Sequence, residues 1–574
     1  MGRLRCPSLM GKTDHFGQSF ARSAGCATLQ AMLVPPPPSV ALARSSSAVT
    51  TILSRAELAF IAIVTLAFGC ISILLGKDKG WDFLNYHWYD AYAFLHSRLG
   101  FDVAVAHHAT YFNPLIHLPF YWLATAGTVW LALFYSGVLH GLNILPLYLL
   151  ARSALTLPDT RWLAAALALS GLLGSTVISM IGNTSYDTVL SALVFGGLAV
   201  LIIRRDTLCA AAAPAANTAA VAGFLIGLAT GLKLVEGFYA VGFALVLLLL
   251  PGRPAVRCAR VFAGGAAGVA AVLLGAGFWF LHLARATGNP LFPFYNSVFG
   301  SPLIAPTFFG STNFLPVGLA PTLSFPFRFL LDYRIADDAP FRDLRIPLVY
   351  ALLPIASVWF AIARPASLPL VAVPARRILF IFAAGSYIAW LASFAVYRYL
   401  VGLEMLAPLL FVAVLDCAPL APRLRLTAVA ILLLTAALFG RYSFGDNVGI
   451  RDPYVQVTGL SFPNPANSML LMSGYEPMAY LIPSLPPAIP VLRIDGWLAE
   501  PGDASGLTAL MRARVAAHRG DLFLLAAPTE HMAADRATRA YGLEIVTARC
   551  REIHSNLGGP YQLCPLRKRP AGIP

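Results

Sequence analysis

The sequence predicts an all-α polytopic membrane protein of about eleven transmembrane helices that ends in a small α/β domain. Of its 574 residues, 58% are hydrophobic and 12% are charged, and the mean hydropathy is +0.70. Soluble domains carry about 25% charged residues. Apolar runs long enough to cross a bilayer of ~30 Å recur along most of the chain. From residue 441 the pattern changes to short apolar runs and one amphipathic segment, which is typical of a small α/β domain.

The formal net charge of +14 is distributed over short loops rather than gathered in one basic domain. We therefore expect no nucleic-acid partner. Basic loops between apolar runs mark the cytoplasmic side, and here they fall on one side together with the basic N-terminus. We expect a bacterial inner membrane protein with a cytoplasmic N-terminus and a periplasmic C-terminus. The basic loops contain Arg152 and Arg161, Arg204 and Arg205, Arg253 to Arg260, Arg364 to Arg377, and Arg423 and Arg425.

Three regions follow from these patterns. Residues 1–57 are basic and Ser-rich and contain "PPPP" from Pro35, and they read either as a disordered extension or as a start-site artefact. Residues 58–440 form the predicted transmembrane domain, with outer loops at 76–128 and 284–345. Residues 441–574 form the predicted periplasmic domain.

The predicted transmembrane helices are eleven apolar segments. The fifth and sixth are short, and with Lys233 and Glu236 between them they are either two crossings or two incomplete helices that meet inside the membrane. Gly223, Gly227 and Gly231 recur every four residues, which favours close helix packing in lipid. The predicted spans are Leu58–Leu75, Val129–Ala151, Leu163–Met180, Asp187–Ile203, Ala219–Gly231, Phe238–Leu250, Val261–Leu283, Ile346–Ala363, Ile378–Val396, Gly402–Asp416 and Leu426–Gly440.

The C-terminal domain is predicted from three segments. The runs "PVLRI" and "DLFLLAA" indicate strands, and "GLTALMRARVAAHRG" indicates an amphipathic helix closed by Gly520. Cys550 and Cys564 either form a disulfide in an oxidising compartment or stay as two thiols. The domain contains no catalytic signature, so we expect a structural or acceptor-holding module.

Several reaction classes are disfavoured by the absence of their motifs. "GLATGLK" from Gly227 does not have the spacing of a nucleotide-binding G-x-x-x-x-G-K-[ST] loop. The sequence has no C-x-x-C pair, H-E-x-x-H helix or G-x-S-x-G elbow. We therefore do not expect an ATP-driven pump, a metalloprotease or a serine hydrolase.

The candidate site residues lie in the predicted outer loops and at the ends of the spans beside them. Asp82 lies in "GWDFLNYHWYDAYAFLHSRLG" and Asp187 ends "GNTSYD". Partly buried carboxylates beside aromatic rings suit a general base for a hydroxylated substrate. Lys233 and Arg398 are placed to bind a lipid phosphate. The alternatives are a Lys233–Glu236 pair and a role for Arg398 as an interfacial anchor.

Aromatic and histidine side chains complete the first outer loop. Tyr86 and Tyr111 offer faces on which sugars can stack. His87 is expected either to orient an acceptor or bind a metal, or to be an ordinary hydrogen-bonded histidine. The loop from Gly80 is predicted to fold over the membrane face as a lid. No cofactor is indicated, and a divalent metal is left open.

The order of these parts resembles the GT-C superfamily of polyprenyl-phosphate-sugar-dependent glycosyltransferases, which includes protein O-mannosyltransferases and aminoarabinose transferases. The resemblance covers residues 58–440 and rests also on "TGNPLFPFYNSVFGSP", "FRDLRIPLVY" and "VYRYLVGLEMLAPLL". It implies that Asp82 is the catalytic carboxylate and Asp187 the acid of the second loop. Many members have two adjacent acids in the first loop, whereas Trp81 and Phe83 flank Asp82, which argues against a metal-binding pair there.

The function implied is an inverting glycosyltransferase that moves a hexose or pentose from a polyprenyl-phosphate donor to an envelope lipid, glycan or protein. A phosphate leaving group needs no protonation, so one carboxylate suffices as base. Lys233 and Arg398 would stabilise the charge that develops on the phosphate. The alternatives are a flippase for lipid-linked saccharides, an O-antigen ligase or polymerase, and a GT-C-like protein without catalytic activity.

Overall fold

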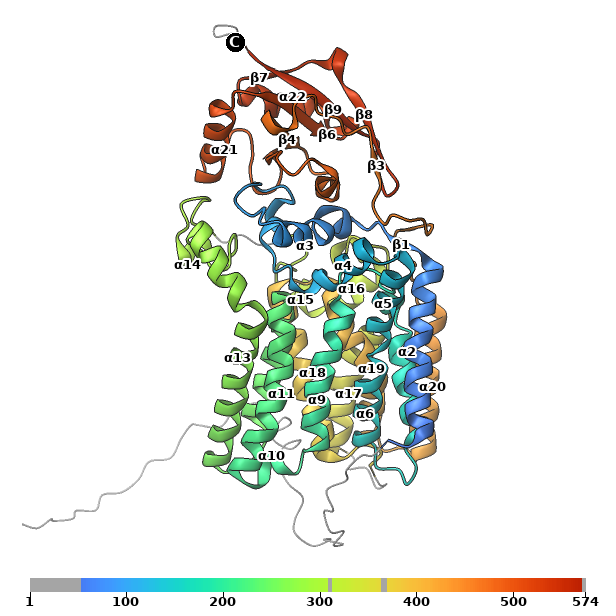
Figure 1. Ribbon diagram of the computed structural model, residues 1–574. Coiled ribbons are helices and arrows are strands. Elements are labelled where there is room, and N and C mark those ends of the chain that lie inside the picture. Colours follow the sequence, from blue (N-terminus) through green and yellow to red (C-terminus); the bar gives the residue numbers. More distant parts are fainter. Residues whose placement is uncertain (1–52, 308–311, 363–368, 570–574) are drawn as a thin grey trace, which may run out of the picture.

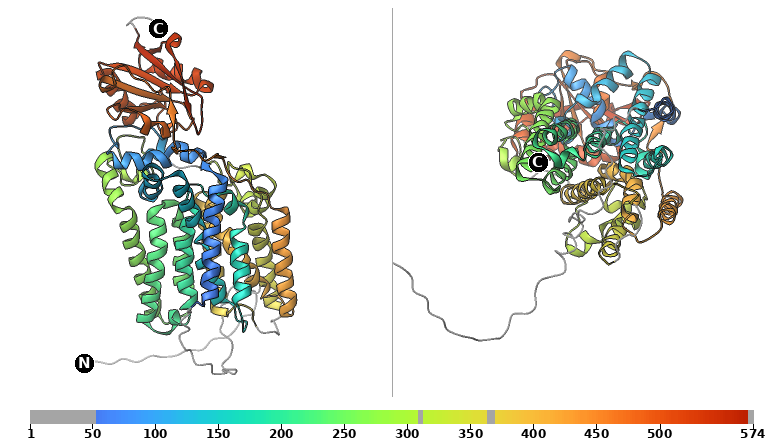
Figure 2. Two further views of the ribbon diagram at one scale, coloured as in Figure 1. Left: turned by 45° about the vertical axis from the view of Figure 1, so that its right-hand side comes forward. Right: turned by 90° about the horizontal axis from the view of Figure 1, so that it is seen from below.

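The computed structural model describes residues 53–307, 312–362 and 369–569, so most of the predicted N-terminal extension lies outside it. A long bundle of helices forms one part of the molecule, and the C-terminal domain lies on one end of that bundle (Figure 1). The short helix α3, Trp88–Leu95, lies between the two parts. Figure 2 shows the same arrangement from a second direction.

The bundle agrees with the predicted pattern of apolar segments. Within the described residues, seven helices are long and apolar enough to cross a membrane, and five shorter apolar helices accompany them. Each of the eleven predicted spans coincides with a helix, four of them with shorter ones, so the number of crossings stays a prediction. The helices are α2 Arg55–Leu75, α4 Leu118–Ala126, α5 Val129–Gly141, α6 Ile144–Ala154, α7 Arg161–Leu172, α8 Ser175–Ser179, α9 Asp187–Ile203, α10 Thr207–Ala210, α11 Ala212–Leu232, α12 Gly237–Leu249, α13 Pro254–Thr287, α14 Asn296–Phe299, α15 Leu319–Leu323, α16 Phe325–Leu331, α17 Arg345–Ile362, α18 Val373–Ser393, α19 Val401–Leu415 and α20 Pro422–Phe439.

Several predicted spans differ from the structure. The second is divided, because α5 ends at Gly141 and the chain restarts as α6 at Ile144. The third is divided, because α7 ends at Leu172 and the chain restarts as α8 at Ser175. The fifth begins earlier than predicted, so that α11 has 21 residues. Of the two alternatives for the fifth segment, α11 fits the crossing, because it is long and apolar enough to span a membrane and the Ala-rich sequence before Ala219 extends it.

The predicted glycine contact is confirmed at the interface of α11 and α13. A Cβ atom at Gly223 would lie 2.2 Å from the carbonyl oxygen of Gly264, and one at Gly227 would lie 2.3 Å from that of Gly268. Real Cβ atoms do not approach this closely, so the two backbones are in contact along the repeat. This contact fixes the end of α11, where Lys233 lies.

The C-terminal domain contains a seven-stranded mixed sheet with the order β3-β8-β9-β6-β4-β5, in which β7 also pairs with β9. β4 is parallel to both β5 and β6, and β9 is antiparallel to β6. The predicted strands and helix are confirmed, although the helix ends at Ala517, before Gly520. The elements are β3 Val457–Thr458, β4 Ser468–Ser473, β5 Val491–Asp495, α21 Gly506–Ala517, β6 Asp521–Ala526, α22 His531–Ala540, β7 Leu543–Ile545, β8 Arg551–Ser555 and β9 Tyr561–Lys568.

A disulfide joins Cys550 and Cys564 across 14 positions of the chain. Of the two alternatives that the sequence left open, the structure has the bonded pair. The bond connects the residue before β8 to β9, within the same sheet. It therefore closes the last hairpin of the domain.

The loop at residues 76–128, called the first loop below, is attached to the C-terminal domain. Its strand β1, Lys77–Asp78, pairs with β2, Asn447–Val448. Val103 donates its N–H to the Val491 oxygen at 2.9 Å and accepts from the Arg493 N–H at 3.0 Å, which adds a bridge to the edge of β5. The loop thus lies between the bundle and the sheet and is bound to both, since Asn113 also donates to the carbonyl oxygens of Gly231 and Gly275. Its role as a lid stays a prediction.

Candidate functional site

Four of the polar residues singled out from the sequence meet at the end of the bundle that faces the C-terminal domain. They come from four separate segments of the chain, and each lies where a helix begins or ends. Asp82 precedes the π-helical turn η1, Phe83–His87; Asp187 is the first residue of α9; Lys233 follows α11; and Arg398 lies in the 3-10 turn η6, Tyr397–Leu400, before α19.

Local backbone geometry places the two carboxylates. Tyr186 has a left-handed conformation with φ 59°, which is costly for a bulky side chain and turns the chain directly into α9. Asp187 thereby occupies the N-terminal position of that helix, where the helix dipole stabilises a negative charge. Asp82 introduces a π-helical turn, a local feature that is found frequently at functional sites.

The four side chains form a connected ion-pair cluster. Arg398 Nη1 donates to Asp82 Oδ2 at 2.7 Å, and Arg398 Nε lies 3.7 Å from Asp187 Oδ2. Lys233 Nζ donates to Asp187 Oδ1 at 2.5 Å and to the Ser185 carbonyl at 2.9 Å. The ring of Tyr399 lies 5.6 Å from Lys233 Nζ and 5.4 Å from the Arg398 guanidinium carbon. Two carboxylates and two cations therefore balance in charge around one aromatic ring.

The pairing decides which carboxylate Lys233 binds, whereas the alternative role of Arg398 as an interfacial anchor stays a prediction. Lys233 binds Asp187, whereas both carboxylate oxygens of Glu236 are buried without a hydrogen-bond partner in the described part of the chain. Arg398 binds Asp82 through its guanidinium, and 30% of its side chain remains exposed. Arg398 thus has a specific partner as well as a solvent-facing surface.

The predicted residue His87 belongs to a second network beside the cluster. Asp78 Oδ2 accepts from the hydroxyl of Thr184 at 2.9 Å, and the same hydroxyl oxygen lies 2.6 Å from His87 Nδ1. Because Thr184 gives its proton to Asp78, His87 Nδ1 is the donor in the second bond. Burial, together with the charges of His117, Lys233 and Arg398, holds the pKa of His87 well below its usual value. A neutral His87 therefore ties the first loop to the turn that carries Asp187.

The structure separates the two predicted tyrosines. Tyr86 is buried near the cluster, and its pKa is raised well above the usual value by burial and by the charge of Asp82. Tyr111 instead packs its ring against Phe292 at 4.7 Å, and its carbonyl accepts from Trp279 Nε1 at 2.9 Å. Tyr111 lies in the core between the first loop and α13, where its contacts are those of packing.

Three neighbours of the cluster were not predicted as site residues. Thr184 and Tyr399 lie within the quoted segments "GNTSYD" and "YRYL", so their position beside a predicted residue was the available signal. Asp337 Oδ2 accepts from the Arg398 backbone N–H at 2.9 Å from a loop 61 residues away, and no sequence pattern indicates that contact.

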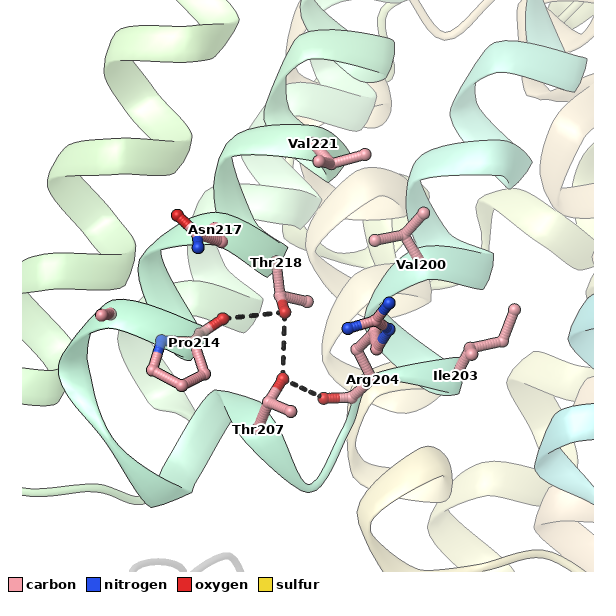
Figure 3. Close-up of a pocket in the computed structure, with 9 residues that line it drawn as sticks. Val200, Ile203, Arg204, Thr207, Pro214, Asn217, Thr218 and Val221 are labelled. Carbon is pink, nitrogen blue, oxygen red and sulfur yellow. Dashed lines mark hydrogen bonds between the residues drawn. The ribbon is translucent and has the colours of Figure 1, made fainter. Parts of the chain in front are cut away.

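Among the residues that the structure describes, no group of three or more His, Cys, Asp or Glu side chains is arranged to hold a metal ion. A cavity of about 520 Å³ lies between α9 and α11 and is lined by Arg204, Thr207, Asn217 and Thr218 (Figure 3). It is at the opposite end of α9 from Asp187, about 25 Å away along a helix of 17 residues, and so is separate from the cluster.

A second, more apolar cavity of about 610 Å³ lies among α17, α18 and α19. Leu403 and Leu410 of α19 line one part of it, and the lining residues that carry hydroxyl groups are Thr322, Tyr350 and Tyr387. Leu403 lies in the first turn of α19, directly after the turn η6 that carries Arg398, and no residue of the ion-pair cluster lines this cavity.

Comparisons with known proteins give one structural match. No family model and no curated protein matches the chain. The chain is similar to the crystal structure of ArnT from Cupriavidus metallidurans in the apo state, at 16% sequence identity and a TM-score of 0.39, with 89% of this chain and 98% of that chain covered. At this identity and TM-score, no activity and no residue role is carried from ArnT to this chain. The protein described here is a polytopic helical membrane protein with a C-terminal sheet domain.

Proposed function

We propose that this protein is an integral-membrane glycosyltransferase that moves a sugar from a polyprenyl-phosphate donor to an envelope lipid, glycan or protein. The observation that carries the proposal is the convergence of Asp82, Asp187, Lys233 and Arg398 at one end of the helical bundle. A carboxylate beside two cations offers a base and a phosphate site within one cluster.

The proposed reaction divides these groups into two roles. The donor phosphate binds the Arg398 guanidinium as a fork and the Lys233 ammonium as a point charge. Asp82 accepts the proton of the acceptor hydroxyl while the oxygen of that hydroxyl attacks the anomeric carbon of the donor sugar. The bond from that carbon to the phosphate oxygen breaks as the new glycosidic bond forms, and the phosphate leaves as an anion. In-line attack inverts the anomeric configuration.

The ion pairs suggest how the base becomes available. Arg398 Nη1 donates to the Asp82 carboxylate at 2.7 Å. The phosphate of the sugar donor competes with the Asp82 carboxylate for the N–H groups of Arg398. When the phosphate binds them, the Asp82 oxygen is open to accept a proton. Asp187 remains bound to Lys233 and keeps that cation directed at the site. Binding of the donor would thus be coupled to activation of the base.

The position of the cluster supports a periplasmic reaction. The basic loops predicted to be cytoplasmic follow the ends of α6, α9, α12 and α19 that point away from the C-terminal domain. By the excess of cations on that side, we assign the cluster and the C-terminal domain to the periplasmic face. We assign the polyprenyl chain to the apolar cavity among α17, α18 and α19, because a lipid tail needs an apolar path beside its phosphate.

The proposal is tested by mass spectrometry of envelope glycans and lipids from a deletion strain complemented with wild-type protein or with Asp82→Asn at matched expression. We expect a defined sugar to disappear on deletion, its polyprenyl-linked donor to accumulate, and only the wild type to restore it. Asp446→Asn, at an exposed acid on the same side, is the matched control and should restore the sugar. Full restoration by Asp82→Asn would contradict the role of the base.

The same experiment separates the rival functions. A flippase for lipid-linked saccharides would leave Asp82→Asn active in the strain but lose lipid translocation on deletion. A GT-C-like protein without catalytic activity would show no change in any envelope sugar on deletion. Loss of a flippase also makes the donor accumulate and the sugar disappear, so failure of Asp82→Asn to restore the sugar is the result expected only for the transferase.

A further inference from the structure

A group of four aromatic rings lies where the first loop meets the C-terminal domain, directly beside Asp82. Trp81 comes from the first loop, and its ring centroid is 5.0 Å from that of Trp497. His107 lies 4.8 Å from Trp497 and 6.2 Å from Tyr475, and Trp497 lies 6.1 Å from Tyr475. We call these four side chains the aromatic platform.

The aromatic platform is held in place by specific contacts of His107. His107 has a left-handed backbone with φ 56°, a conformation that costs energy for a non-glycine residue and points to function. Its Nδ1 accepts from the Trp497 backbone N–H at 3.2 Å, while a Cβ atom at Gly496 would lie 2.5 Å from that nitrogen. The buried imidazole therefore fixes the loop that carries Trp497.

The rings above this buried histidine are open to ligand. Trp81 is 36% exposed, Tyr475 43% and Trp497 47%, whereas His107 is fully buried. Large aromatic faces that are exposed and clustered, with a buried polar group beneath them, are typical of a binding surface rather than of a core.

The sheet topology places the C-terminal part of the platform at a position that favours ligand binding. β4 lies between β5 and β6 in the sheet and is parallel to both. Tyr475 follows the carboxyl end of β4, Trp497 follows that of β5, and Glu530 follows that of β6. Open α/β sheets bind ligands outside the carboxyl ends of parallel strands, so three strands direct side chains to one binding edge.

The charges around the rings select the chemical class of the ligand. Partial burial together with the carboxylates of Asp495, Glu500 and Glu530 raises the pKa of Tyr475. Glu500 is exposed and can accept hydrogen bonds from hydroxyl or ammonium groups, whereas Asp495 is buried and Glu530 already accepts from the backbone N–H of Tyr475 at 2.6 Å. The three negative charges together disfavour phosphate and other anions. Aromatic faces with carboxylate acceptors at their edge fit a neutral or amino-substituted pyranose ring.

We infer that the aromatic platform binds a saccharide of the acceptor, which it presents to Asp82. That the saccharide is the acceptor rests on the proposed glycosyl transfer. That the platform binds a saccharide rests on the geometry of the platform alone. Trp81 immediately precedes Asp82, whose carboxylate points to Arg398 on the bundle side. Asp82 thus lies between the cations assigned to the donor and the rings assigned to the acceptor.

The test is binding of the full-length protein, purified in detergent micelles, to an array of bacterial envelope oligosaccharides. We expect the wild type to bind a defined set of glycans, and Trp497→Ala to bind them about tenfold more weakly, the effect of losing one stacking partner. Trp497→Phe keeps a ring and should stay within about threefold of wild type. Tyr442→Ala removes an aromatic side chain of similar exposure, 49%, outside the platform and should have no effect.

Two results would overturn the inference: no arrayed glycan binds the wild type, or Trp497→Ala binds as the wild type does. Trp81→Ala, on the other side of the platform, serves as the second variant should Trp497→Ala fail to fold in a thermal melt. Failure of the transfer proposal looks different. Glycan binding that depends on Trp497, together with an envelope that Asp82→Asn leaves unchanged, would keep the saccharide site and remove the transferase.

Discussion

Replacing Lys233 by Met removes the cation nearest to a buried carboxylate. Asp187 has no exposed side-chain area, its Oδ1 lies 2.5 Å from Lys233 Nζ, and its Oδ2 has no hydrogen-bond partner among the described residues. Breaking a buried ion pair on one side costs about 3–5 kcal/mol of unfolding free energy, because the other charge is left uncompensated. Arg398 Nε remains 3.7 Å from Asp187, so we expect the lower end, about 3 kcal/mol.

The double variant Lys233→Met/Asp187→Asn separates the ion pair from packing. With both charges gone, no buried carboxylate is left unpaired, and we expect about 2 kcal/mol of the loss to be recovered. The unfolding free energy is measured by circular dichroism of the full chain in mixed micelles with increasing dodecyl sulfate.

The matched control for this cycle is Arg204→Met. Arg204 is an exposed cation at the other end of α9, and its loss should change the unfolding free energy by no more than about 0.5 kcal/mol. A Lys233→Met variant as stable as this control would refute the buried pair. A double variant that loses as much unfolding free energy as Lys233→Met and Asp187→Asn together would also refute it.

Three further predictions concern the packing, the disulfide and the pH dependence. Gly227→Ala should lower the melting temperature measurably, because its Cβ would lie 2.3 Å from the Gly268 oxygen, whereas Gly265→Ala faces open space and should not. Cys550→Ser should destabilise the C-terminal domain by about 3 kcal/mol in urea, the value for closing a loop of about 15 residues, and a reductant should have the same effect on wild type only. Burial lowers the pKa of His108 to about 4. The contribution of neutral His108 to the unfolding free energy is therefore full above the pKa of the unfolded chain, near 6.5, and is lost as the pH falls toward 4. His108→Gln should reduce the change of melting temperature with pH in that window.

The positions of the cluster residues could be predicted from the sequence because hydropathy determines where each apolar run ends. Asp82, Asp187, Lys233 and Arg398 all border apolar runs, and the count of crossings between them places the four on one side. The area of one end of a helical bundle is small, so polar residues assigned to the same end are brought near one another.

The pairing within the cluster could not be predicted in the same way. Lys233 is three residues from Glu236 and 46 from Asp187, yet it binds Asp187. The choice depends on how α9 packs against α11, which the helix contacts fix and the local spacing does not. The length of α11 was underestimated for a related reason, since an Ala-rich turn has helix propensity without the hydropathy of a span.

The aromatic platform had no signal in the sequence for its C-terminal half. Tyr475 and Trp497 are separated by 22 positions and become neighbours only because β4 and β5 are adjacent and parallel. Strand order in a mixed sheet depends on long-range pairing, which the alternation of apolar residues does not encode. Trp81, by contrast, lies next to a predicted site residue.

The charge balance of the cluster leads to one prediction that distinguishes a base from a structural carboxylate. Asp82 and a donor phosphate compete for the same Arg398 donors, so removing the charge of Asp82 should free them. We expect polyprenyl phosphate to bind Asp82→Asn about tenfold more tightly than wild type, about 1.4 kcal/mol, while sugar transfer is lost. Arg398→Gln should weaken both binding and transfer.

The measurement is native mass spectrometry of the full chain with polyprenyl phosphate titrated into micelles, with Asp446→Asn as the control that changes neither quantity. A carboxylate that only holds Arg398 in place would, when neutralised, let the guanidinium move and weaken lipid binding. Weaker or unchanged binding by Asp82→Asn would therefore assign Asp82 to structure. Tighter lipid binding combined with lost sugar transfer requires that the Asp82 carboxylate compete with the phosphate before the reaction and act in the reaction itself. A folding defect cannot explain this result, because it would not strengthen lipid binding while abolishing transfer.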